Sequence, residues 1–85
     1  MSTEFQTAVN KAVPLETRRD AIDRLIASRD NRNLAVLVRT DGLTGQLRRQ
    51  AINGLVTNRA TEHLEALADD PSVPPSLRRR ATEAV

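Results

Sequence analysis

Arginine is the residue type with the clearest chemistry in this sequence, and it occurs at a fixed spacing. An Arg-Arg dipeptide begins at residues 18, 48 and 78, so that the copies are equally spaced along the chain. A guanidinium group presents planar, paired N–H donors that suit carboxylates and phosphates. Arginines at this spacing are therefore suited to an acidic protein surface or to phosphates.

The residue types needed for catalysis or metal binding are scarce. Cysteine is absent and His63 is the single histidine, so an ordinary zinc or iron site cannot be assembled. The adjacent Asp69 and Asp70 fit a turn, and Asp20 and Asp23 fit an exposed helix face. A general acid needs a water-excluding pocket, which neither carboxylate pair is expected to have. We expect no enzyme activity, no metal, no cofactor and no small-molecule substrate.

The arginine pairs belong to a longer internal repeat. Leu47-Arg48-Arg49-Gln50-Ala51-Ile52 is matched by residues 17–22 and by residues 77–82. Each repeat contains two segments whose apolar residues recur at i, i+3 and i+4, the spacing of a helix. The sequence predicts one all-α domain over residues 1–85, with six helices in three pairs at about 1–28, 29–58 and 59–85.

Local signals place several helix boundaries. Asn31 and Thr44 are expected to cap the two helices of the second repeat. Asp70-Pro71 is expected to end a helix, and Pro74-Pro75 to begin the last one. In the first repeat the helical spacing continues from residue 5 to residue 13, one residue out of register with the second repeat, and Pro14 opens the next helix.

The repeated sequence resembles a known family. The segments Leu47–Leu55, Leu64–Leu67 with Asp69-Asp70, and Leu77–Ala81 resemble HEAT-like repeats, in particular the short type of phycobilisome-lyase-like proteins. The resemblance implies a right-handed α-solenoid in which an acidic turn follows the first helix of each pair and a Leu-Arg-x-x-Ala motif opens the second. Thr17 stands where this motif has Leu, and Thr82 follows it where the other two copies have Ile. Because the family includes scaffolds, adaptors, lyases and DNA-repair enzymes, the resemblance implies an architecture and not an activity.

Helical geometry separates the arginines into two sets. Each residue of a helix turns about 100° from the previous one, so Arg48 falls within the buried arc, whereas Arg49 falls on the open face. The inner set, Arg18, Arg48 and Arg78, is expected to lay its apolar stems on the core. Its guanidinium groups are expected to reach turn acids. The candidate acids are Asp41, Asp69 and Asp70.

The outer set, Arg19, Arg49 and Arg79, is expected to form a basic ladder on the exposed face of the second helices. Arg19 has Glu16 and Asp23 at helical spacing, and Arg79 has Glu83, so a solvated face with local ion pairs is one interpretation. A partner surface is the other. The residues predicted to bind a partner are Arg19, Asp23, Arg49, Asn53, Arg79, Arg80 and Glu83.

Self-association is a further prediction. The apolar pattern of the last helix continues to the final residue, so its end is expected to be covered by a second copy. The residues predicted for this contact are Leu77, Ala81 and Val85. An acidic stripe formed by Glu62, Glu65 and Asp69 also permits head-to-tail assembly with the basic ladder.

Composition bounds the remaining alternatives. The chain is 39% hydrophobic and 28% charged with a formal net charge of +2, and Phe5 is its single aromatic residue. Because this positive charge is small, nucleic-acid backbone binding is a lesser alternative. A structural subunit of a viral or phage particle is a second alternative. No apolar run approaches the ~20 residues of a membrane span, and the N-terminus lacks a signal-peptide pattern. We expect a cytoplasmic protein, or one within a virion, whose main function is protein interaction or assembly.

Overall fold

Six helices account for most of the computed structural model, which describes residues 3–85. Their bounds are α1 Thr3–Val9, α2 Leu15–Ala27, α3 Asn31–Arg39, α4 Gly45–Thr57, α5 Thr61–Ala68 and α6 Pro75–Glu83. The prediction of an all-α chain with six helices is confirmed. Between the helices the chain forms short turns, and no strand occurs within the described residues.

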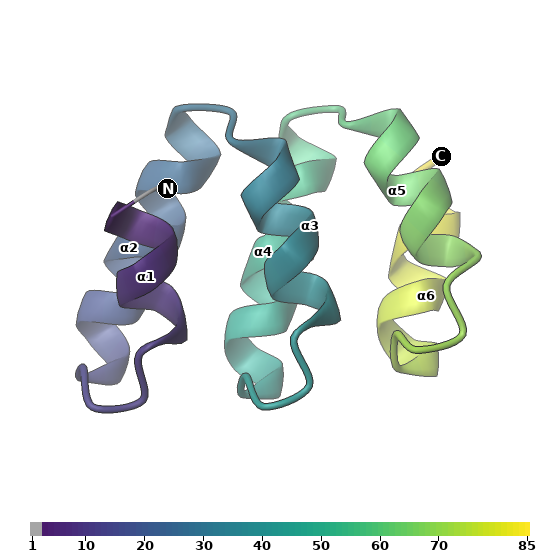
Figure 1. The fold of residues 1–85 in the computed structure, drawn as a ribbon. Coiled ribbons are helices and arrows are strands. Elements are labelled where there is room, and N and C mark those ends of the chain that lie inside the picture. Colours follow the sequence, from purple (N-terminus) through teal and green to yellow (C-terminus); the bar gives the residue numbers. More distant parts are fainter. Residues whose placement is uncertain (1–2) are drawn as a thin grey trace.

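The helices pack as three consecutive pairs in two layers. α1 packs on α2, α3 on α4 and α5 on α6, and α4 contacts the second helix of each neighbouring pair (Figure 1). The first helices lie in front and the second helices behind in that view. The predicted pairing is therefore confirmed, and the second helices form a continuous row.

The core lies between the two layers and consists of aliphatic side chains. Its larger fully buried members come from every pair, and they sit at the helical spacing seen in the sequence. They include Ile22, Leu25, Leu34, Leu37, Leu47, Ile52, Leu55, Leu64 and Leu67. Because these side chains face inward from helices of only two to four turns, stability depends on packing between helices rather than on any helix alone.

The first helix is shorter than predicted, and its register also differs. α1 ends at Val9, and the chain then turns because the Asn10 side chain accepts a hydrogen bond from the backbone N–H of Ala12. The prediction of helix up to residue 13 is wrong. The alignment of the first pair with the second is seen in two equivalent hydrogen bonds. Arg18 donates to the carbonyl of Ala8, ten residues before it, and Arg48 donates to that of Val38, also ten residues before it. The first pair is thus in register with the second.

The boundaries of the other helices largely follow the predicted signals. Thr44 caps α4 by accepting a hydrogen bond from the N–H of Leu47, as expected. The cap of α3 is Asp30, whose carboxylate accepts from Asn33, and Asn31 is the first helical residue. The Asn31 cap is therefore wrong by one position. α5 ends before Asp70, and α6 begins at Pro75, as predicted.

The polar departures from the repeat occur at the two ends of the row. Thr17 and Thr82 are exposed, whereas the corresponding residues of the middle pair, Leu47 and Ile52, are fully buried. Within residues 3–85, α2 and α6 have a neighbouring pair on one side only. A side chain at these two positions therefore meets solvent, which explains why threonine is tolerated there.

The two junctions between helix pairs share one unusual backbone conformation. Arg29 and Arg59 have φ values of 57° and 54°, in the left-handed region that favours glycine. At each junction the following residue donates its N–H to a carbonyl near the end of the helix, Asp30 to Leu25 and Ala60 to Leu55. This is the Schellman arrangement, which satisfies the carbonyls at the end of α2 and α4.

Replacing Arg59 by glycine is expected to stabilise the protein. A non-glycine residue in this conformation carries a steric cost, and relief of that cost outweighs the extra freedom glycine gives the unfolded chain. We expect Arg59→Gly to raise the free energy of unfolding by about 0.5–1 kcal/mol in urea titrations. Arg24→Gly, within α2, is the control and should lower it by about 1 kcal/mol. Changes of the same sign would contradict this explanation.

Candidate interaction surface

Two of the inner arginines are buried and cap the end of the preceding helix. Arg18 and Arg48 are 6% and 7% exposed. The Nε of Arg18 donates to the carbonyl of Ala8 at 2.9 Å, and that of Arg48 donates to Val38 at the same distance. Both carbonyls belong to the last turn of a helix, where no intrahelical N–H is available and where positive charge is favoured. The predicted burial is confirmed.

The predicted acidic partners of these arginines are wrong. The guanidinium groups of Arg18 and Arg48 bond backbone carbonyls and, within the described residues, no turn carboxylate. Arg78 is only half-buried, and its Nε has no hydrogen-bond partner among residues 3–85. Asp70 instead accepts from the Nε of Arg39 at 2.7 Å, which joins the end of α3 to the turn after α5. The acidic turn thus links the second and third pairs.

Asp70 is the titratable group with the clearest shift among the described residues. The hydrogen bond from Arg39, and then those from the hydroxyl and the N–H of Ser72, lower the pKa of Asp70 to about 2. A carboxyl whose pKa is lower in the folded state contributes stability that is complete above its unfolded value, near pH 4. That contribution is lost as the pH falls through about 2.

Asp70→Asn is therefore expected to lessen the acid sensitivity of the fold. We expect the urea midpoint of the wild type to fall more steeply than that of the variant between about pH 4 and pH 2. Every other residue is the same in the two proteins, so the difference between the two curves isolates Asp70. Parallel curves over this range would show that the link to Arg39 makes no contribution to stability.

The outer arginines are exposed and have no partner among residues 3–85. The side chains of Arg19, Arg49 and Arg79 make no hydrogen bond or ion pair in this part of the chain, and all three lie on the outer face of the second helices. The predicted local pairs of Arg19 with Glu16 or Asp23, and of Arg79 with Glu83, do not form. The outer arginines thus bring to this face three exposed guanidinium groups whose donors are unpaired within residues 3–85.

Hydrogen bonds between neighbouring second helices cross this face at equivalent positions. The Nε2 of Gln50 donates to the Asp23 carboxylate at 2.9 Å and to the backbone carbonyl of Arg19 at 3.0 Å. One pair further along, the Nε of Arg80 donates to the Asn53 amide oxygen at 3.0 Å. Both side-chain contacts join residues 27 apart in sequence. These bonds are not predicted by the sequence pattern, although Gln50 and Arg80 occupy equivalent positions of the repeat.

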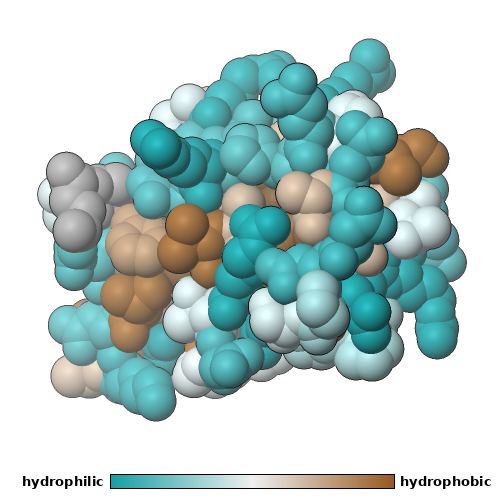
Figure 2. Space-filling model, turned by 45° about the vertical axis from the view of Figure 1, so that its right-hand side comes forward, coloured by the Kyte–Doolittle hydropathy of each residue, from teal (hydrophilic) through white to brown (hydrophobic). Residues whose placement is uncertain are grey.

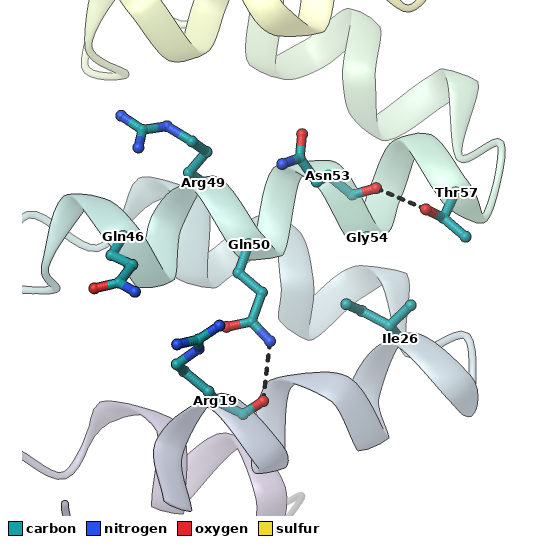
Figure 3. Close-up of a pocket in the computed structure, with 8 residues that line it drawn as sticks. All are labelled: Arg19, Ile26, Gln46, Arg49, Gln50, Asn53, Gly54 and Thr57. Carbon is teal, nitrogen blue, oxygen red and sulfur yellow. Dashed lines mark hydrogen bonds between the residues drawn. The ribbon is translucent and has the colours of Figure 1, made fainter. Parts of the chain in front are cut away.

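Two grooves lie between the second helices and share a wall formed by Arg49 and Asn53. The α2–α4 groove, of about 320 Å³, has Arg19 at one end and Ile26 and Gly54 on its floor. Figure 3 shows Gln50 reaching the carbonyl of Arg19 across it, while Arg49 points away from α2. The α4–α6 groove, of about 220 Å³, is lined by Arg49, Asn53, Ser76, Leu77, Arg79, Arg80 and Glu83.

The floor of the first groove explains an apparent irregularity in α4. Gly54 is buried within a helix, and a Cβ there would lie against Cγ1 of Ile26 and 2.7 Å from its Cδ1. Glycine at this position therefore allows α2 and α4 to approach closely. The sequence alone leaves the role of Gly54 open.

The charge of the second-helix face changes along the row. α2 carries three exposed acids, Glu16, Asp20 and Asp23, whereas α4 carries none and α6 carries only Glu83. A shallow hollow on α2 is lined by the three acids together with Arg19. The face is thus acidic at its α2 edge and basic over α4 and α6.

All seven residues predicted to bind a partner lie on this face. Arg19 and Asp23 come from α2, Arg49 and Asn53 from α4, and the others from α6; each lines at least one of the grooves or the hollow. Asp23, Asn53 and Arg80 also hold the helices to one another. The face therefore combines fixed cross-links with the free guanidinium groups of the outer arginines.

The residues predicted for self-association are placed differently. Leu77 is 6% exposed and Ala81 is fully buried in the core of the chain itself, whereas Val85 is 57% exposed. Of the three, Val85 alone offers substantial apolar surface to a second copy. Self-association at this end stays a prediction.

The layer of first helices presents a different surface. Figure 2 shows the layer of first helices after a 45° turn that brings the C-terminal pair forward. The surface in this view is mostly hydrophilic, and its apolar side chains lie mainly toward the left. The acidic stripe, Glu62, Glu65 and Asp69, is exposed along α5 and at its end.

His63 is partly exposed beside the acidic stripe, and no group of three metal-ligating side chains occurs within residues 3–85. No helix in this range is long and apolar enough to span a bilayer.

Comparisons with protein-family models, with curated proteins and with solved structures found no match to this chain.

Proposed function

We propose that the chain is a HEAT-like α-solenoid of three helix pairs that works as a non-enzymatic protein-interaction or assembly module. The binding surface is the exposed face of α2, α4 and α6. The observation that carries the proposal is the row of outer arginines, Arg19, Arg49 and Arg79, which stand beside two grooves with no partner among the described residues. Exposed arginines are enriched in protein interfaces because their guanidinium groups bond carboxylates bidentately.

The rigidity of the face supports this role. The Gln50–Asp23 and Arg80–Asn53 hydrogen bonds hold neighbouring helices at fixed offsets, and Gly54 lets α2 and α4 pack closely. A surface that is already ordered loses little conformational entropy when a partner binds. The spacing of the outer arginines is therefore set before any partner arrives.

A protein partner accounts for the charge pattern better than a nucleic-acid backbone does. Acids on α2 interrupt the positive face, and the net charge of the chain is only +2. Three phosphate contacts would give weak binding with a log–log salt slope of only about −3. A protein partner can match a face that is acidic at one edge and basic at the other.

The proposal is tested by comparative affinity capture from source cells. Three baits are used: the wild type, the double variant Arg49→Glu/Arg79→Glu, and the control Arg32→Glu on α3, which is exposed on the other layer. We expect a protein that both the wild type and the control retain and that the double variant loses. An identical set of captured proteins for all three baits would refute the proposed surface.

A further inference from the structure

We propose, on the basis of the function above, that the second-helix face binds an extended acidic segment of its partner, with carboxylates at every third residue lying against Arg49 and Arg79. The proposal specifies the charge, the conformation and the position of this segment.

The charge of the segment follows from the α4–α6 groove. Arg49, Arg79 and Arg80 line this groove, and Glu83 is the one acid among the described residues of its lining. The Nε of Arg80 is held by Asn53, so this guanidinium is fixed in place while its terminal nitrogens stay available. The Ser76 hydroxyl adds a further donor to the lining. A groove with this many donors and one acid favours carboxylates, which accept charge-assisted hydrogen bonds.

The conformation follows from the spacing of the arginines. Arg49 and Arg79 occupy equivalent positions on α4 and α6, which pack against each other. Packed helices lie about 8–10 Å apart, so equivalent side chains are separated by about that distance. A polyproline II segment has three residues per turn and rises about 3.1 Å per residue, which places every third side chain on one side at about 9 Å. Carboxylates at that interval match the two arginines.

The position follows from the change in charge along the row. The α2 edge carries Glu16, Asp20 and Asp23, which would repel a carboxylate. The acidic part of the segment therefore lies over α4 and α6, and a neutral or basic part lies over α2. Arg19 is flanked by these acids and contributes less than Arg49 or Arg79.

The test is direct titration with synthetic peptides by fluorescence anisotropy at low ionic strength. The first labelled peptide has the tripeptide Glu-Pro-Ala repeated three times. The second has the same composition but with its three glutamates consecutive. The third probe is a single-stranded oligonucleotide of equal charge. The proteins are the wild type, Arg49→Ala/Arg79→Ala, and the control Arg24→Ala, whose side chain is exposed on α2 and lines neither groove.

We expect the spaced peptide to bind the wild type at least about threefold more tightly than its isomer. We also expect the double substitution to weaken this binding about tenfold, and Arg24→Ala to change it less than about twofold. Equal affinities for the two peptides, or equal losses in the two variants, would overturn the proposal. Tighter binding of the oligonucleotide with the same dependence on Arg49 and Arg79 would overturn it in favour of a phosphate backbone.

Failure of this inference is distinguishable from failure of the proposed function. If the charge-reversed bait loses a cellular partner but neither peptide binds, the interaction face stands and the acidic segment is refuted. If capture is unaffected by charge reversal, the proposed function itself is refuted, whatever the peptides do.

Discussion

Arg48→Ala is expected to be the most destabilising single substitution of a charged residue in this protein, at about 3 kcal/mol. The Arg48 side chain is buried, at 7% exposed, and its Nε bonds the Val38 carbonyl at the end of α3. Its removal leaves that carbonyl buried without a donor, for about 1.5–3 kcal/mol, and also deletes the packing of the stem. At about 0.05–0.15 kcal/mol per residue, a domain of this size has a total stability of only about 4–13 kcal/mol. Urea unfolding should therefore show a much lower midpoint at unchanged slope.

Two further variants separate the causes of this effect. Arg49→Ala, one residue along the same helix, is the matched control and should change stability by less than about 0.5 kcal/mol, because its side chain is exposed. Arg48→Met keeps the apolar stem and removes a guanidinium whose Nη2 is buried without a partner among residues 3–85. We expect Arg48→Met to lose about half as much as Arg48→Ala. Similar losses for Arg48→Ala and Arg49→Ala would contradict the helix-capping role.

Gly54→Ala is expected to destabilise the protein by about 1–2 kcal/mol, although alanine is the better helix former. A Cβ at Gly54 would lie 2.7 Å from Cδ1 of Ile26 and against its Cγ1, so either α2 and α4 must separate or Ile26 must leave its rotamer. Overpacking costs about 1–3 kcal/mol, and contacts this close belong to the upper part of that range, above the roughly 1 kcal/mol gained in helix propensity. The measurement is again the free energy of unfolding in urea.

The sign of this effect should reverse when Ile26 is made smaller. In an Ile26→Ala background the clash is absent, so Gly54→Ala should raise stability by up to about 1 kcal/mol. Gly45→Ala provides a control in the same helix, because a Cβ there would meet nothing within 4 Å beyond its chain neighbours and the backbone of its own helix. It should be neutral or slightly stabilising. A loss of stability from Gly54→Ala in both backgrounds would refute close approach of α2 and α4 as the cause.

Much of the fold could be predicted because the same pattern of apolar residues and arginines occurs three times in the sequence. Apolar spacing located the helix pairs, and the angular positions of Arg48 and Arg49 correctly separated a buried from an exposed side chain. Such features depend on local periodicity, which sequence carries directly. The partner of Arg48 could not be found in this way. The identity of that partner depends on where α3 ends relative to α4. Because the acceptor is a backbone carbonyl, which every residue has, the residue types do not reveal it.

The features that were missed depend on contacts between helix pairs. The bonds of Gln50 to Asp23 and of Arg80 to Asn53 require the lateral offset of neighbouring helices, which the period of the repeat alone does not give. The left-handed conformation of Arg29 and Arg59 could not be predicted either, because glycine is the residue that usually marks such a helix end and neither position carries it. The candidate face was therefore predicted as a set of residues, while its grooves and cross-links came from the structure.

The central claim is that a partner contacts the outer arginines, and it is tested most directly by the NMR signals of the arginine side chains. The ¹⁵Nε–Hε resonances would be recorded for the protein alone and with the captured partner. We expect the signals of Arg19, Arg49 and Arg79 to shift, while those of the buried Arg18 and Arg48 stay in place. Shifts confined to Arg32, on α3 in the other layer, with the signals of Arg19, Arg49 and Arg79 unchanged, would contradict the account.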